Sequence, residues 1–326
     1  MVRLASIGSS SISDWFLDAV KRVDGITLTT VYSRSLDKAE SFAKKHGAVK
    51  WYDSLEQLGA DPEVDAVYVA SPNFAHKDQA IAMMRAGKHV ICEKALGSNA
   101  KEVAEMIAVA KETGVIFMEA MRTLYDPGFV AIQNNLEKLG SIRHIDFRFC
   151  QYSSRYDAYK EGKKVNIFDP TTSAGGLMDI GVYCVEPLVA LFSMPNEIKT
   201  FSWNLEENVD GCGVILAKYE SALATLTYSK ITNHKIPSEI QGENGTMVIE
   251  RISDPRKITI YYRNGEIEEI PVEVPVENNI CYEIQAFVQA IGEKKDLKQY
   301  HKISQETMEF MDAVRKQNNI VFPADK

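Results

Sequence analysis

The first 120 residues alternate between short apolar runs and stretches whose apolar residues recur with helical spacing. Six runs are predicted strands: residues 2–7, 26–32, 49–52, 64–70, 90–92 and 115–119. Helical spacing lies between these runs, for example over residues 35–47 and 100–113. Because strands separated by helices of this length form a parallel, doubly wound sheet, residues 1–122 are predicted to be one α/β domain.

The pattern changes after residue 122, where apolar and polar residues alternate over longer segments. These segments are residues 143–152, 198–203, 214–228, 239–249 and 257–270. A period of two predicts antiparallel strands that bury one face. The predicted fold class is therefore α/β, a doubly wound parallel sheet followed over residues 123–326 by an α+β domain with a large, open, mostly antiparallel sheet.

Two charged residues, Glu93 and Lys94, follow the apolar run at residues 90–92 directly. Ligands of open α/β sheets bind outside the carboxyl ends of the strands, so a lysine at this position is a candidate reactive group. Lysine and glutamate are commonly exposed, and a solvated surface pair is the alternative explanation.

The first predicted strand leads into a turn of small residues and then a helix. Gly8, Ser10, Ser11 and Ile12 lie where a dinucleotide-binding fold holds pyrophosphate, on the N–H groups of a helix N-terminus. Ser10 and Ser13 stand where the usual fingerprint has its second and third glycines. An ordinary strand-to-helix turn is therefore the alternative.

The second strand ends at Ser33 and Arg34, where an NAD site would place an acidic residue on the ribose hydroxyls. Arginine forms bidentate, charge-assisted hydrogen bonds to phosphate, and serine adds a hydroxyl. The pair therefore favours NADP over NAD as the cofactor. An exposed loop cation is the alternative explanation of Arg34.

Ser71, Pro72 and Asn73 follow the strand predicted at residues 64–70. Pro72 stops that strand and leaves Asn73 at the carboxyl edge of the sheet, where its amide can bond a ribose or a carboxamide. His76 comes next in the chain. It is either a further contact of the same site or a histidine satisfied at a helix N-terminus.

In the C-terminal half, a glycine pair precedes a stretch of helical apolar spacing that carries Asp179 and Tyr183. Residues i and i+4 lie on one face of a helix, so we expect these two side chains to be neighbours. A buried Asp–Tyr structural pair is one explanation. A site for substrate contact and proton transfer is the other.

The composition excludes several functional classes. The chain has 326 residues, 45% of them apolar, and a formal net charge of −8 without a long basic block, so nucleic acid is not an expected partner. We find no secretory pattern at the N-terminus and no run of roughly 18 apolar residues, and we expect no membrane association. Five scattered cysteines without a CxxC motif predict no disulfide framework, no metal site and a cytoplasmic location.

Taken together, these motifs resemble the Gfo/Idh/MocA oxidoreductase family over nearly the whole chain. The resemblance rests on the small-residue turn at Gly8 and on residues 71–73, 86–94, 118–120 and 175–183. The segment 118–120 and a tyrosine at position 183 are most similar to the branch with dimeric dihydrodiol dehydrogenase and xylose dehydrogenase. One departure is Ala95, where the family motif has proline after the lysine.

This resemblance implies a Rossmann domain that binds NADP and a C-terminal domain that binds a sugar-like substrate and forms homodimers or higher oligomers through its sheet. Hydride transfer at a carbinol or ketone carbon is the implied reaction. Lys94 and Tyr183 are then the expected catalytic residues, Asp179 orients substrate hydroxyls, Arg122 is a further substrate contact, and Glu93 adjoins the cofactor. A non-catalytic NADP-binding sensor and a redox-assisted glycosidase are the alternative functions.

Overall fold

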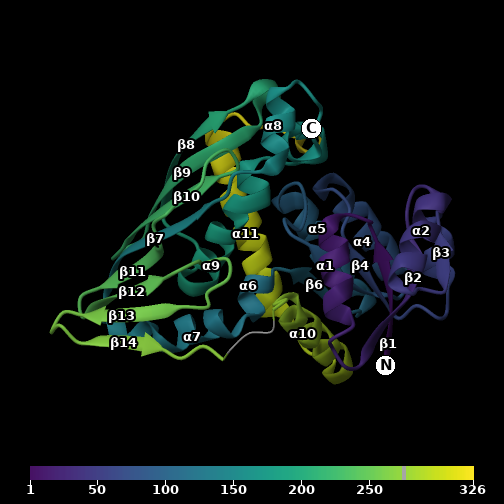
Figure 1. Ribbon diagram of the computed structural model, residues 1–326, viewed down its shortest axis with the longest axis horizontal. Helices are drawn as coiled ribbons and strands as arrows, with labels where there is room; N and C mark the ends of the chain where they lie inside the picture. Colours follow the sequence, from purple (N-terminus) through teal and green to yellow (C-terminus); the bar gives the residue numbers. More distant parts are fainter. Residues whose placement is uncertain (274–276) are drawn as a thin grey trace. The chain divides into compact units, whose positions relative to one another are not determined.

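The computed structural model describes residues 1–273 and 277–326, and its contacts divide the chain into two compact units (Figure 1). Unit 1 contains Met1–Arg122 and the described residues of Val276–Gln305. Unit 2 contains the described residues of Thr123–Pro275 together with Glu306–Lys326. Each unit has its own sheet.

Unit 1 is built around six parallel strands in the order β3-β2-β1-β4-β5-β6. The strands are β1 Val2–Ile7, β2 Ile26–Tyr32, β3 Lys50–Tyr52, β4 Ala66–Val69, β5 His89–Glu93 and β6 Phe117–Ala120. The helices are α1 Ser11–Val20, α2 Leu36–His46, α3 Leu55–Ala60, α4 His76–Arg85, α5 Ala100–Thr113 and α10 Ile280–Glu293. The predicted parallel sheet is confirmed, and its order reverses between β1 and β4, the type of switch point at which doubly wound sheets bind ligands.

Local sequence explains where these elements form. All four residues of β4 are buried, as expected for a strand covered on both faces. Asn99 caps the N-terminus of helix α5, because its side chain accepts the Glu102 N–H at 3.0 Å, and the helix buries Val103 and Met106. These short-range signals are the ones that the hydrophobic pattern predicts.

Helix α10 differs from the prediction that assigned every residue after 122 to the C-terminal domain, because it packs in unit 1. The Cys281 thiol contacts the Ala19 carbonyl oxygen of α1 at 3.8 Å, and Val288 lies beside Gly25. Its apolar face, which includes the fully buried Phe287, is thereby removed from water. The chain returns to the first unit after a long excursion, which a local pattern does not encode.

Unit 2 contains an eight-stranded sheet in the order β14-β13-β12-β11-β7-β10-β9-β8. The strands are β7 Ile142–Cys150, β8 Glu197–Asn204, β9 Asp210–Lys218, β10 Leu223–Ser229, β11 Ser238–Gly242, β12 Gly245–Ile249, β13 Ile258–Tyr262 and β14 Ile267–Ile270. Strands β7 and β10 are parallel and the other neighbours are antiparallel, so the mostly antiparallel prediction is confirmed. The single segment expected at 214–228 is two strands joined at Tyr219, whose N–H donates to Ala222.

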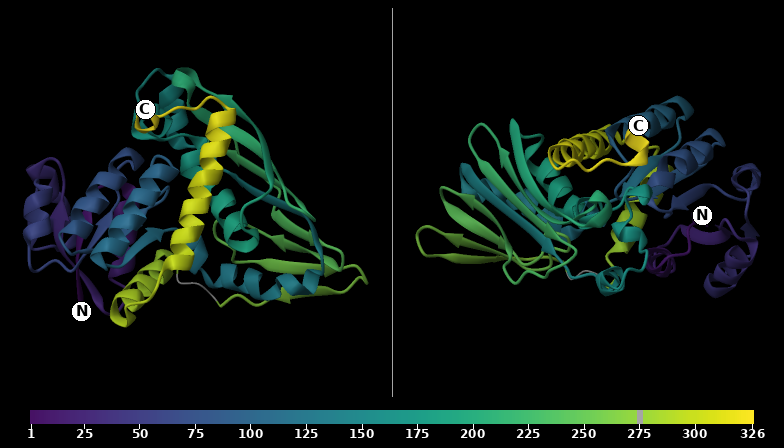
Figure 2. Two further views of the ribbon diagram at one scale, coloured as in Figure 1. Left: turned by 180° about the vertical axis from the view of Figure 1, so that it is seen from behind. Right: turned by 90° about the horizontal axis from the view of Figure 1, so that it is seen from above.

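The helices of unit 2 leave one face of this sheet open. They are most of α6 Arg122–Tyr125, α7 Pro127–Asn135, α8 Ser154–Lys160, α9 Val182–Phe192 and the end of α11 Lys298–Gln317. Helix α9 packs on β7 and β10, and Figure 2 shows it against one face of the sheet. On β9, Ile215 and Ala217 are buried whereas Val214 and Leu216 are exposed. Across the described part of the chain, no helix is long and apolar enough to cross a membrane.

Candidate functional site

The carboxyl ends of four strands lie together at one edge of the unit 1 sheet. Ile7 of β1 pairs with Tyr32 of β2 and with Val69 of β4, and Val69 pairs with Cys92 of β5. The residues that follow these strands are Gly8, Ser33, Arg34, Ser71, Pro72, Asn73 and Lys94. The sheet therefore brings the predicted cofactor residues of separate chain segments to one edge.

The turn after β1 requires glycine. Gly8 has a φ of +116°, and a Cβ atom on it would lie 2.5 Å from the Ala70 carbonyl oxygen. Helix α1 begins directly after this turn, and within the described residues the Ser10 side chain makes no capping bond to it. Ser13 is fully buried, which accounts for a small residue at the third fingerprint position. An N-terminus of this kind offers backbone N–H groups to an anion.

Arg34 lies directly after β2 with its side chain exposed. Among residues 1–273 and 277–326, no hydrogen bond or ion pair engages its guanidinium. The neighbouring Ser33 is fixed by its backbone N–H, which donates to the Tyr52 carbonyl oxygen at 3.1 Å. The strand end therefore presents an available cation in the place where an NAD site carries a carboxylate.

His76 is buried in the protein interior and does not lie where the expected direct contact with a cofactor would require it. The side chain is fully buried at the start of α4, with Nε2 2.8 Å from the Ser71 carbonyl oxygen and Nδ1 3.0 Å from that of Ala95. A neutral imidazole donates to only one of them. Burial lowers the pKa of His76 to about 4, although both carbonyls oppose that change. The ring thus links the loop after β4 to the loop after β5.

Lys94 is the accessible residue of an otherwise buried segment. Its side chain is half-buried, whereas residues 91–93 and 95–99 are buried on either side. The Lys94–Ala95 peptide bond is cis, at the position where the family motif has proline. The Tyr68 hydroxyl donates to Glu93 Oε1 at 2.7 Å beneath it. Glu93, the last residue of β5, is therefore buried and hydrogen-bonded within unit 1.

Three of the buried carboxyl groups of unit 1 have a raised pKa. Burial raises the pKa of Glu93, of Glu119 to about 7, and of Glu283 well above its ordinary value. The charge of Glu93 adds to the increase at the other two, and Arg122 opposes it at Glu93 and Glu283. Sequence reasoning missed Glu283 because it lies on α10. Within the described residues, no group of three or more His, Cys, Asp or Glu side chains is arranged to hold a metal ion.

The predicted Asp179–Tyr183 helix begins with a π-helical turn, Leu177–Gly181, before α9 continues it. Asp179 lies in this π turn and Tyr183 in the first turn of α9, so both belong to the predicted helical stretch; that their side chains are neighbours stays a prediction. The structure gives Asp179 an unexpected partner: its Oδ2 lies 2.6 Å from the Lys230 ammonium. The Tyr183 ring meets Phe149 edge-on, with ring centroids 5.5 Å apart.

A buried aspartate explains the glycines before this turn. A Cβ atom on Gly175, whose φ is +137°, would lie 2.3 Å from Asp210 Oδ1. Asp210 Oδ2 accepts the Leu177 N–H at 2.7 Å and thereby holds the first residue of the π turn. Burial raises the pKa of Asp210 to about 6, while the bond from Leu177 opposes it. Asp210 and Lys230 carry no local sequence signal, since both meet the turn only through the fold.

Comparison with known proteins identifies the family. Residues 2–121 match the oxidoreductase family model with an NAD-binding Rossmann fold, Gfo/Idh/MocA, and residues 135–248 match the Gfo/Idh/MocA C-terminal domain. The scyllo-inositol 2-dehydrogenase (NADP(+)) of Bacillus subtilis is 43% identical over 328 residues that cover 100% of both chains. The chain belongs to the Gfo/Idh/MocA oxidoreductase family.

A second relative supports this assignment, and a solved structure shares the fold. Trans-1,2-dihydrobenzene-1,2-diol dehydrogenase of Mus musculus is 30% identical and covers 92% of this chain and 91% of its own. The crystal structure of KijD10, a 3-ketoreductase from Actinomadura kijaniata, superimposes with a TM-score of 0.86 at 24% identity over 97% of each chain, a likeness of fold. The predicted family is confirmed, and the match to a dihydrodiol dehydrogenase is consistent with the predicted branch. The protein is an NAD(P)-binding oxidoreductase of that family.

Proposed function

We propose that this Gfo/Idh/MocA protein is an NADP-dependent dehydrogenase or reductase acting on a polyol, sugar or diol. The reaction moves a hydride between the nicotinamide and a carbinol or ketone carbon. The observation that carries the proposal is the register of β1, β2, β4 and β5, which places Gly8, Arg34, Asn73 and Lys94 at one sheet edge. Relatives named for scyllo-inositol and for a dihydrodiol support a substrate with neighbouring hydroxyl groups on a ring.

Residues 1–122 are proposed to hold the cofactor. The N–H groups around Ser10, Ser11 and Ile12 bind the pyrophosphate, and Gly8 lets the turn that carries them pass close to the Ala70 backbone. The available guanidinium of Arg34 binds the ribose 2′-phosphate. When bound, NADP supplies or accepts the hydride.

Further residues of the same edge complete the proposed cofactor site. The Ser33 hydroxyl assists Arg34 at the 2′-phosphate, and the Asn73 amide bonds the ribose or the carboxamide. Ser71 and Pro72 set the loop that presents Asn73, and His76 positions that loop through the Ser71 carbonyl oxygen. Glu93 supports this site from the protein interior, where its carboxylate accepts a hydrogen bond from the Tyr68 hydroxyl.

Lys94 and Tyr183 are the proposed catalytic residues. Oxidation of an alcohol needs a base for the hydroxyl proton, and reduction of a ketone needs an acid that returns it. The Tyr183 hydroxyl serves in both directions. The Lys94 ammonium donates to the substrate oxygen and stabilises the negative charge that develops there, an effect that grows where water is excluded.

Asp179 is proposed to orient the substrate through its carboxylate, which accepts hydrogen bonds from the neighbouring hydroxyl groups. Lys230 supports this role, because its ammonium lies 2.6 Å from Asp179 Oδ2 and fixes the direction of that carboxylate. Arg122 is proposed as a further substrate contact.

The test is a screen of inositols, sugars, polyols and dihydrodiols for change in NADPH absorbance at 340 nm. The expected result is turnover with NADP that falls at least a hundredfold in Lys94→Ala and in Tyr183→Phe. Lys101→Ala and Tyr261→Phe, which alter exposed side chains, are the matched controls. Intact turnover in both catalytic variants would refute the assignment. NADP binding without hydride exchange would favour the sensor, and cleavage of an aryl glycoside would favour the glycosidase.

The open face of the unit 2 sheet is the proposed surface for self-association. Phe201 and Trp203 on β8 are 85% and 69% exposed, and Leu216 on β9 is 55% exposed. Phe201 is directly opposite Val214 in the β8–β9 ladder, so the exposed apolar side chains are contiguous across strands. A patch of this kind is typical of an interface, and a two-fold homodimer is the simplest assembly.

Five free cysteines, four of them buried, support the proposed cytoplasmic location.

A further inference from the structure

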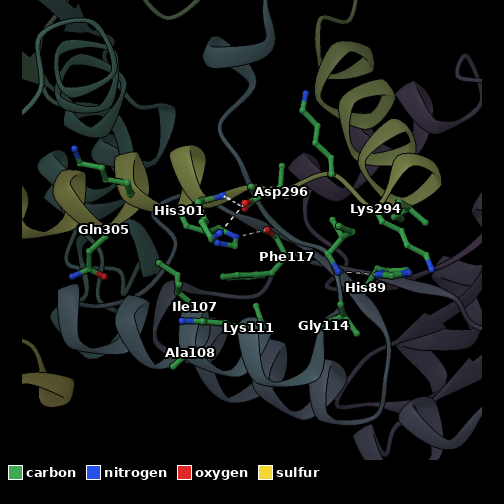
Figure 3. Close-up of a pocket in the computed structure, with 18 of the residues that line it drawn as sticks. His89, Ile107, Ala108, Lys111, Gly114, Phe117, Lys294, Asp296, His301 and Gln305 are labelled. Carbon is green, nitrogen blue, oxygen red and sulfur yellow. Dashed lines mark hydrogen bonds and ion pairs between the residues drawn. The ribbon is translucent and has the colours of Figure 1, made fainter.

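Unit 1 contains a cavity of about 790 Å³ at the amino-terminal ends of β5 and β6 (Figure 3). His89 begins β5 and Phe117 begins β6, and both line the cavity. Lys94 follows the other end of β5, and five residues of strand span roughly 16 Å. The cavity is therefore separate from the candidate dehydrogenase site.

The floor and walls of this cavity are apolar. Figure 3 shows α5 with Ile107 and Ala108 along one wall and the segment with Asp296 and His301 along the other, with Phe117 between them. Ile116, Ile291 and Leu297 also line it. The His301 ring has a structural hydrogen bond, because its Nε2 donates to the Phe117 carbonyl oxygen at 2.8 Å. A volume of this size is in the range of small-molecule sites, roughly 300–1,000 Å³.

The rim of the cavity is basic in a chain whose net charge is −8. Five lysines line it: Lys111, Lys294, Lys295, Lys298 and Lys302. Asp296 is the one acidic residue among its described lining residues, and it is paired with Lys298 at 3.0 Å. Lys111 and Lys294 have no ion pair among the described residues. The local excess of positive charge is thus opposite in sign to that of the whole protein.

We propose that this cavity binds an amphipathic monoanion, such as a medium-chain carboxylate. The apolar chain lies on the α5 wall around Ile107 and Ala108, where its transfer from water drives binding. The carboxylate lies at the rim, where the lysine ammonium groups satisfy it. A highly polar ligand such as a sugar would leave its hydroxyls unpaired against this apolar floor.

The test is calorimetric titration of the full-length protein with decanoate, with decylammonium as the probe of equal chain length and opposite charge. Decanoate is expected to bind at least tenfold more tightly than decylammonium. Its affinity is expected to fall as the salt concentration rises from 50 to 500 mM, because salt screens the attraction between the carboxylate and the lysines. Equal affinity for the two probes would overturn the proposal, since it would mean unspecific adsorption of an apolar chain.

Two kinds of variant localise the site. Ala108→Trp places a large side chain in the cavity from an exposed position on α5 and is expected to weaken decanoate binding at least tenfold. Ala60→Trp, at the exposed end of α3, is its control. The double variant Lys111→Glu/Lys294→Glu reverses two surface charges without touching the core and is expected to abolish the preference for decanoate, whereas Lys38→Glu/Lys101→Glu keeps it. Unchanged decanoate affinity in the Lys111/Lys294 variant would refute the site.

Discussion

Replacing His76 with glutamine is expected to make the stability of unit 1 less dependent on pH. The ring is fully buried, and its nitrogens lie 2.8 Å and 3.0 Å from two backbone carbonyl oxygens. Burial lowers its pKa from 6.5 to about 4 in the folded protein. Glutamine can still donate one hydrogen bond in this position but takes up no proton.

The sign of the effect follows from proton linkage. Above pH 6.5 the His76 ring is neutral in both states, and the folded state keeps its full advantage. As the pH falls from 6.5 towards 4, the unfolded chain takes up a proton before the folded one does, so the free energy of unfolding decreases. The loss is about 2 kcal/mol at pH 5 and about 3 kcal/mol below pH 4, at about 1.4 kcal/mol per pH unit.

The measurement is urea unfolding at pH 7.5, 6.0 and 5.0, followed by the fluorescence of Trp15 and Trp51 in a Trp203→Phe background. At pH 7.5 the His76→Gln variant is expected to be less stable by about 1–3 kcal/mol, the cost of imperfectly paired buried groups. That difference is expected to shrink by about 2 kcal/mol at pH 5.0. Glu119 titrates in both proteins and cancels in the comparison.

A difference between His76→Gln and the parent that stays constant within about 0.5 kcal/mol across this pH range would refute the reasoning. His144→Gln is the control, because that half-buried histidine lies in unit 2. The parent and His144→Gln are expected to have parallel pH profiles.

Three further substitutions test other parts of the proposal. Arg34→Ala is expected to raise the Kd for NADPH roughly 10- to 100-fold in a fluorescence titration and to leave NADH binding unchanged, because it removes a charge-assisted hydrogen bond to the 2′-phosphate. Arg85→Ala is the control, and an equal loss of affinity for both cofactors would contradict the 2′-phosphate role. Lys230→Met is expected to raise the substrate KM about tenfold at unchanged NADPH affinity, with partial recovery in Lys230→Arg; an unchanged KM would refute its part in orienting Asp179. Phe201→Glu is expected to halve the molar mass measured by light scattering, whereas Leu36→Glu, at an exposed apolar residue of unit 1, is expected to preserve it.

Much of the candidate cofactor site follows from the sequence alone. Apolar runs and helical spacing locate β1, β2, β4 and β5 to within two residues. In a parallel sheet all carboxyl ends lie at one edge, so the residues after each strand must gather there. Gly8 and Lys94 were predicted in this way, because their placement depends only on local pattern and on the rule of the fold.

The tertiary structure decided which distant residues meet. Helix α10 contributes Glu283 to unit 1, Lys230 pairs with Asp179, and His76 bridges Ser71 and Ala95 within the protein interior. Hydrophobic periodicity reports which face of an element is buried but not which element covers it. The partner of a buried charge is set by packing between segments far apart in the chain. A sequence motif therefore predicts which residues take part in a site, and only this packing determines which of them are in contact.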